Sequence, residues 1–81
     1  INASVLALHG YADPMVPPSA IDGFAEEMTG AGVAWQLHAY GNVLHAFTNP
    51  EAQDHDFGTV YNEIADKRAW QTSLNFFDEI F

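Results

Sequence analysis

Two apolar segments of the chain have patterns that are typical of β-strands. Residues 4–10 contain a Val-Leu-Ala-Leu run without polar interruptions, which predicts a strand buried on both faces, as in a parallel sheet covered by helices. Residues 33–40 alternate, which predicts a strand near a sheet edge with one face partly exposed to water. One face of this second strand would carry Val33, Trp35, Leu37 and Ala39, and the other Gln36, His38 and Tyr40.

Apolar residues at helical spacing predict two amphipathic helices. In the first, Ser19 is the expected N-cap, with Asp22 in the place of a capping-box acid, and Gly30 and Gly32 are expected to end the helix. Its apolar stripe consists of Ile21, Phe24, Ala25 and Met28. The second helix is expected from about residue 62 to residue 80, with Trp70 on its flank and an inner stripe of Ile64, Ala65, Ala69, Ser73, Phe76, Phe77 and Ile80.

The order strand, loop, helix, strand, loop, helix predicts an α/β fold whose parallel strands are joined by a right-handed crossover. The first loop, residues 11–18, contains three prolines that prevent regular structure. The second, about residues 41–60, is expected to be irregular, and loops of this length usually carry function or become ordered on a partner. Two strands and two helices do not cover their own apolar faces. We therefore expect an incomplete part of a larger domain, in line with a start at Ile1 rather than at Met.

Composition narrows the classes of function. The 81 residues are 48% hydrophobic, too apolar for a disordered acidic tail. Eleven acidic against two basic residues give a formal net charge of -9, which argues against binding to nucleic acids or anionic membranes. No apolar run is long enough for a transmembrane helix, and no basic segment of a signal peptide is present. The absence of cysteine excludes disulfides, a thiolate nucleophile from this chain and Cys-ligated zinc, but it does not define a compartment.

Two residues that could cooperate chemically follow the two strands. Asp13 lies three residues past Gly10, and His45 lies five residues past Tyr40. The carboxyl ends of neighbouring parallel strands meet at one edge of a sheet, where ligands bind in open α/β folds. A carboxylate that accepts an imidazole N–H fixes the tautomer and leaves the other ring nitrogen free as a general base. The alternatives are an aspartate that only shapes its turn and a solvated loop histidine.

Three segments resemble the dienelactone hydrolase family of α/β-hydrolases. Residues 10–18, Gly-Tyr-Ala-Asp-Pro-Met-Val-Pro-Pro, are similar to its acid loop, in which a glycine closes the strand and a Val-Pro leads into the helix. Residues 40–60 begin like its histidine loop, a Tyr and a Gly-containing turn followed by His-Ala-Phe, and the last helix is similar too. The resemblance implies that Asp13 is the triad acid and His45 the triad base. Prolyl-oligopeptidase-like peptidases share both loops, so the class is better defined than the subfamily.

The resemblance also implies a substrate pocket and a missing part. Tyr11 and Met15 flank Asp13, and Phe47 follows His45, so these three side chains are candidates for contacts with a small ester or lactone substrate, with packing as the alternative for Phe47. In this family the nucleophile, Cys or Ser, lies upstream of the acid on a strand-to-helix elbow. No such elbow is present, and no serine has its context: the candidates are Ser4, Ser19 and Ser73.

The sequence therefore predicts the C-terminal part of an ester or lactone hydrolase, inactive by itself, without a cofactor. The alternatives are a non-catalytic module of the same fold and a half that acts only when paired with another chain. We also expect the chain to form oligomers or to associate with the missing half of the fold. His9 is expected to be a packed or hydrogen-bonded histidine at the edge of the core, and His38 a residue of the sheet face or the surface. The Asp54-His55-Asp56 cluster, with Glu51 and His45 nearby, is expected to be a solvated loop rather than a metal site.

Overall fold

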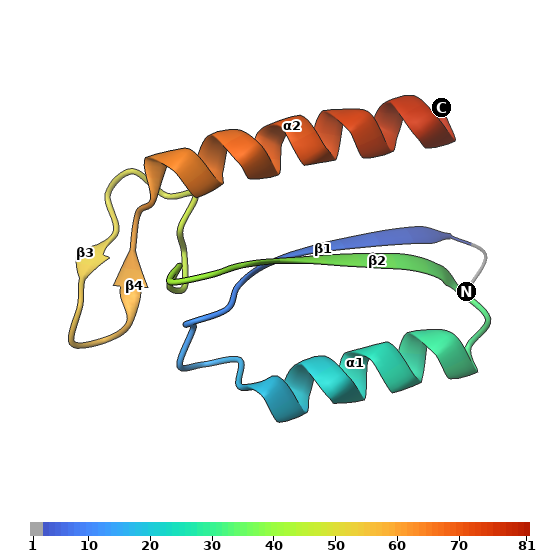
Figure 1. Cartoon of the computed structure of the whole chain (residues 1–81), viewed down its shortest axis with the longest axis horizontal. Coiled ribbons are helices and arrows are strands. Elements are labelled where there is room, and N and C mark those ends of the chain that lie inside the picture. Colours follow the sequence, from blue (N-terminus) through green and yellow to red (C-terminus); the bar gives the residue numbers. More distant parts are fainter. Residues whose placement is uncertain (1–2) are drawn as a thin grey trace.

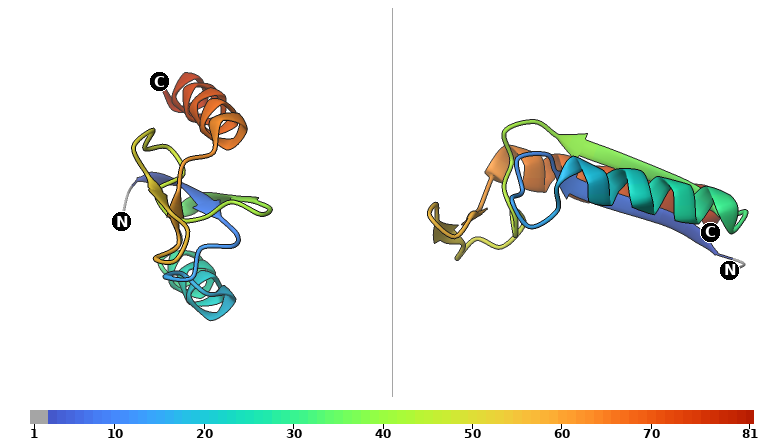
Figure 2. Two further views of the ribbon diagram at one scale, coloured as in Figure 1. Left: turned by 90° about the vertical axis from the view of Figure 1, so that its left-hand side faces the viewer. Right: turned by 90° about the horizontal axis from the view of Figure 1, so that it is seen from below.

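The chain forms three layers, with a helix on each face of a parallel sheet. In the computed structural model, which describes residues 3–81, strands β1 (Ser4–Gly10) and β2 (Ala34–Tyr40) pair from Ser4 opposite Ala34 to Gly10 opposite Tyr40. Helices α1 (Pro18–Gly30) and α2 (Glu63–Ile80) lie on opposite faces of this sheet (Figures 1 and 2). The α/β architecture with parallel strands is therefore confirmed. Ile1 and Asn2 lie outside the described residues.

Helix α1 covers the sheet with the four residues of its expected stripe. Ile21, Phe24, Ala25 and Met28 are the half-buried residues of this helix, and none of its residues is fully buried. Phe24 meets the ring of Trp35 on β2 edge to face, with centroids 5.8 Å apart, and the Trp35 indole Nε1–H donates to Thr29 Oγ1 at 3.1 Å. Because both faces of the sheet carry a helix, neither face of β2 is fully open to water.

A small core lies between the sheet and α2. Val43 and Phe47, from the loop after β2, pack with Ala65 and Ala69 of α2, and Leu8 and Tyr40 contact this cluster from the sheet. Ala65 and Ala69, 2% and 3% exposed, form the inner side of the helix at this contact. Helix α2 begins at Glu63, and the Asn62 side chain caps it by accepting the Ala65 N–H at 2.9 Å. No helix among residues 3–81 is long and apolar enough to span a membrane.

The start of α1 differs from the expectation. The helix begins at Pro18, Pro17 is the N-cap residue, and no side chain caps the helix, so the expectation that Ser19 is the N-cap is wrong. Proline suits the first helical position because its fixed φ is already helical and the N–H that it lacks would have no partner there. The Pro17 carbonyl accepts the Ala20 N–H at 2.9 Å.

The segment between β2 and α2 is more ordered than expected. It contains a short antiparallel hairpin of β3 (Gln53–Asp54) and β4 (Thr59–Val60), which Figure 1 shows beyond the carboxyl ends of β1 and β2. In its turn the Asp54 carboxylate accepts the Phe57 N–H at 3.0 Å, and Gly58 has a φ of 87°. The prediction of an irregular segment is wrong here, because strands of two residues are too short to show an alternating pattern.

The inner face of α2 is narrower than expected. Ala65, Ala69 and Phe76 are buried and Ser73 is half-buried, whereas Ile64, Phe77 and Ile80, which the sequence also assigns to this face, are 62%, 51% and 39% exposed. The sheet beneath α2 has two strands among the described residues, so it covers only one narrow side of the helix. Trp70 on the flank is 66% exposed.

Candidate active site

Backbone contacts join the loops that follow β1 and β2. The Tyr11 N–H donates to the Tyr40 carbonyl at 2.9 Å, and the Ala12 N–H donates to the Val43 carbonyl at 3.0 Å. A Cβ atom at Gly10 would lie 2.5 Å from the Val43 carbonyl oxygen, so only glycine permits this approach. The end of β1 and the loop after β2 are therefore held in direct contact.

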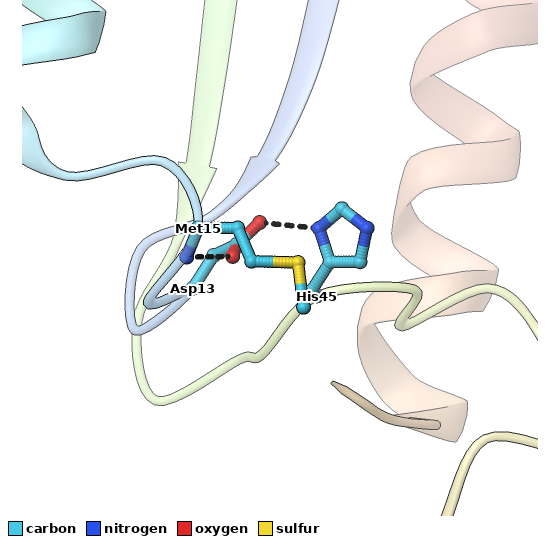
Figure 3. Close-up of polar contacts among 3 residues, drawn as sticks. All are labelled: Asp13, Met15 and His45. Carbon is cyan, nitrogen blue, oxygen red and sulfur yellow. Dashed lines mark hydrogen bonds and ion pairs between the residues drawn. The ribbon is translucent and has the colours of Figure 1, made fainter. Parts of the chain in front are cut away.

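Asp13 is buried at this junction and has a hydrogen bond to each carboxylate oxygen. Oδ1 accepts the Met15 N–H at 2.8 Å, and Oδ2 lies 2.8 Å from His45 Nδ1 (Figure 3). The Asp13 N–H donates to the Gly10 carbonyl at 3.0 Å, which closes the turn. The side chains that the sequence places after two successive strands therefore meet, although they are 32 residues apart.

Opposing effects act on the pKa of the Asp13 carboxyl. Burial raises this pKa, whereas the hydrogen bonds from His45 and from the Met15 amide, together with charge interactions with His45 and His9, lower it. The lowering effects prevail, so the pKa lies below its ordinary value of 3.8. The carboxyl is consequently ionised near neutral pH in spite of its burial.

His45 is anchored through its backbone and leaves one ring nitrogen free. Its N–H donates to the Gly58 carbonyl at 3.0 Å, and its carbonyl accepts the Val60 N–H at 3.1 Å. The next residue, Ala46, has a φ of 58°, in the left-handed region that is unusual for alanine. The His45 side chain is 44% exposed, and Figure 3 shows its second nitrogen pointing away from Asp13. A neutral imidazole in this arrangement can accept a proton from a neighbouring hydroxyl or thiol.

A hollow of about 260 Å³ adjoins the Asp13–His45 pair. Phe47 is 7% exposed and lines it, while it also belongs to the core. Tyr11 and Met15 are 55% and 42% exposed and are outside its lining, which consists of Leu8, His9, Gly10, Asp13, Val16, Leu44, His45, Ala46, Phe47 and Thr48. A larger hollow, about 330 Å³, lies between the end of β2 and the start of α2 and includes neither Asp13 nor His45.

The described serines lie away from this pair. Ser4 begins β1, Ser19 lies in α1, and the Ser73 hydroxyl donates to the Ala69 carbonyl at 2.9 Å. None of them lines the hollow beside His45. Within residues 3–81, no three histidine or carboxylate side chains gather closely enough to hold a metal ion.

Three further features adjoin the Asp13–His45 pair, and two of them were not predicted from the sequence. His9 is packed at the edge of the core, as expected; it lines the hollow, and its buried Nε2 atom has no hydrogen-bond partner among the described residues. The left-handed conformation of Ala46 and the contact of Gly58 with the acid loop have no signature in the order of residues.

Comparisons with known proteins agree with the geometry. The model of the dienelactone hydrolase family matches residues 1–81. Among relatives, the "Uncharacterized protein K02A2.1" of Caenorhabditis elegans is 34% identical over 79 residues, which are 96% of this chain and 50% of the relative. A protein of Salmonella typhimurium strain LT2 named "Putative carboxymethylenebutenolidase" is 27% identical over 77 residues, which are 95% of this chain and 26% of that protein. The chain thus spans half or less of the length of these relatives.

Two solved structures have the same fold over almost the entire chain. The dienelactone hydrolase-like promiscuous phosphotriesterase P91 from metagenomic libraries matches with a TM-score of 0.89 and 37% identity, and the protein titled m3DLH matches with a TM-score of 0.87 and 40% identity. Each match covers 96% of this chain and 33% of the solved chain. On the strength of the family match along its whole length and of these structures, the chain belongs to the dienelactone hydrolase family.

Proposed function

We propose that this chain supplies the acid and the base of the catalytic triad of an ester or lactone hydrolase. The observation that carries the proposal is the 2.8 Å contact between His45 Nδ1 and the buried Asp13 carboxylate. In the proposed mechanism Asp13 holds the Nδ1–H tautomer of His45 and stabilises the imidazolium when it forms. His45 Nε2 then takes the proton of the nucleophile and later gives it to the leaving group.

The nucleophile of this proposed enzyme comes from outside the 81 residues. The chain has no cysteine, and its described serines lie away from the hollow beside His45. The family match and the spans of 33% in the solved relatives support a protein in which further strands carry the nucleophile elbow. The 81 residues would then work only together with the rest of an α/β-hydrolase fold.

The proposed substrates are small carboxylic esters or lactones. The family to which the chain belongs and the name of the Salmonella relative support this class. Acyl transfer by a nucleophile, a base and an acid needs no cofactor. Phe47 in the wall of the hollow and the exposed residues Tyr11 and Met15, which flank Asp13 in the sequence, are proposed to contact the substrate. Because one solved relative is described as a phosphotriesterase, a phosphotriester belongs in the same substrate panel.

The test replaces His45 in the complete protein that carries this chain. Hydrolysis of a p-nitrophenyl ester, a lactone and a phosphotriester is measured for the unchanged protein, for His45→Ala and for His55→Ala, an exposed histidine of the hairpin turn. We expect His45→Ala to lower kcat by about 10²–10⁴-fold, as loss of a general base does, and His55→Ala to leave it unchanged. Equal turnover by His45→Ala and the unchanged protein would refute the role of His45. Absence of hydrolysis across the whole panel would favour the non-catalytic alternative.

A further inference from the structure

His9 is a buried titratable residue that the proposed mechanism leaves unused. It lies near the end of β1, opposite Ala39 of β2, and is 8% exposed. Its Nε2 atom is buried and has no hydrogen-bond partner among the described residues. A buried polar atom without a partner lowers the stability of a fold, so an aliphatic side chain of similar size would be the more stable choice.

The position of His9 relates it to the acid loop. Its side chain lines the same hollow as Asp13 and His45, and its ring meets that of Tyr11 edge to face, with centroids 6.4 Å apart. The turn from Gly10 to Asp13, closed by the Asp13 N–H to Gly10 carbonyl bond, begins at the residue after His9. The imidazole therefore lies against the segment that presents the Asp13 carboxylate.

The titratable groups around His9 are confined to this site. They are Tyr11 and Asp13 of the acid loop and His45 of the loop after β2. On its other side, residues of α1 that share a hollow with it are Ala20, Ile21 and Phe24, which are not titratable. A charge interaction with His9 is among the effects that keep the pKa of Asp13 low. Asp13 is thus the one carboxylate among the described residues that shares a hollow with His9.

We propose that His9 is a positioning residue of the proposed catalytic pair, which packs against the Gly10–Asp13 turn and holds the Asp13 carboxylate in place toward His45. The inference rests on the proposed triad and extends it by a third residue of this chain. Such a residue lowers stability while it improves the site, a conflict that is typical of functional positions.

The test compares His9→Leu with His9→Gln and His38→Leu in the complete protein. His38 is the matched control. It is a half-buried histidine of β2, lies opposite Leu8 of β1, and is absent from the lining of the hollow. For His9→Leu we expect kcat to fall about tenfold or more, KM to change less, and the acid limb of the kcat/KM profile to move to higher pH. The urea midpoint should stay the same or rise, because the unpaired buried nitrogen is removed. His9→Gln, which keeps a planar side chain of similar length against the turn, should recover part of kcat, and His38→Leu should leave kcat and the pH profile unchanged.

Several outcomes would overturn the inference. One is that His9→Leu has an unchanged kcat and an unchanged pH profile. Another is that His9→Leu has a lowered urea midpoint but a normal kcat per folded molecule; His9 would then have only a structural role. If His9→Leu does not fold, His9→Gln decides by the same readouts. Failure of the triad itself is distinguishable, since His45→Ala would then match the unchanged protein, whereas failure of the His9 inference alone leaves His45→Ala inactive and His9→Leu fully active.

Discussion

Asp13 combines two properties that seldom occur together, burial and ionisation. Asp13 is 7% exposed, and its two carboxylate oxygens are bound by the Met15 amide and by His45. Burial alone would favour the neutral acid, but these two hydrogen bonds and the charge interactions with His45 and His9 together favour the charged form more strongly. The same bonds that orient His45 therefore also make the stability of the fold depend on the ionisation of Asp13.

The first prediction concerns this dependence. The pKa of Asp13 is lower in the folded state than its ordinary value of 3.8, so the unfolded state binds more protons between the two values and stability rises with pH there. The contribution of Asp13 is fully present above pH 3.8 and is lost as pH falls through the lowered pKa. We expect urea midpoints to fall more steeply with acidification near and below pH 4 in the unchanged protein than in Asp13→Asn.

The control for this measurement is Asp22→Asn, which changes an exposed carboxylate on α1. Its midpoints should follow those of the unchanged protein over the whole pH range. If Asp13→Asn and the unchanged protein had the same slope below pH 4, the ionised state of Asp13 would contribute nothing to folding, contrary to the structure.

At the scale of single residues, the sequence could predict the pair but not its surroundings. Asp13 and His45 were found because each follows a strand that has its own apolar pattern. The close approach of Gly10 to the Val43 carbonyl and the left-handed backbone of Ala46 depend on contacts between segments that are distant in sequence. A local sequence pattern contains no information on such contacts, so the presence of glycine at position 10 or alanine at position 46 does not by itself predict them.

Among the elements, the hairpin of β3 and β4 connects the two loops of the site. Gly58, between these strands, accepts the His45 N–H through its carbonyl. A Cβ atom at Gly58 would overlap the ring of Pro14 in the acid loop, and the φ of 87° is unfavourable for other residues. One glycine thus contacts the loop of Asp13 and holds the backbone of His45.

The second prediction follows from this double contact. We expect Gly58→Ala to lower the free energy of unfolding by about 1–3 kcal/mol, the range for a strained backbone residue, because the methyl group also displaces Pro14. Activity of the complete protein should fall as well, since Pro14 is adjacent to Asp13. Urea denaturation and the ester assay measure the two effects.

Gly30→Ala is the matched control: a Cβ at Gly30, at the end of α1, meets no atom within 4 Å, so stability should be unchanged or slightly higher. Equal stability of the two alanine variants would contradict the role of Gly58.

Long elements with a clear period were the part of the fold that the sequence could predict. The stripe of α1 and the Asn62 start of α2 agree with the structure, because spacings of three and four residues report directly which side of a helix is covered. The apolar pattern of α2 wrongly assigns Ile64, Phe77 and Ile80 to the buried face, because a pattern shows that side chains are apolar but not what covers them. In the described residues nothing covers them fully.

For the molecule as a whole, the distribution of apolar surface is uneven. Four apolar side chains, Trp70, Leu74, Phe77 and Phe81, are 66%, 46%, 51% and 96% exposed. They are spaced four, three and four residues apart, so they lie along one side of α2 and continue to the residue after its end. Phe77 and Phe81 stack on each other with centroids 6.2 Å apart. Strand β1, the more apolar strand, pairs only with β2 among the described residues, so its other edge is a template for a further strand.

The third prediction is that the isolated 81-residue chain associates with itself and has no esterase activity. Exposed aromatic side chains and an unpaired strand edge favour association, and the formal charge of -9 opposes it only over a short range at physiological salt. Sedimentation velocity over a range of protein concentrations should therefore show species larger than a monomer.

Replacing Trp70 and Phe77 together by Ser should reduce the proportion of these larger species, whereas Phe57→Ser, which removes an exposed aromatic of the hairpin turn, should have a smaller effect. A monomer at all concentrations would show that this surface is tolerated in water, and ester turnover by the pure chain would mean that its own residues include a nucleophile. Association without turnover would agree with a segment whose apolar surfaces and catalytic pair both need the remaining strands of the fold.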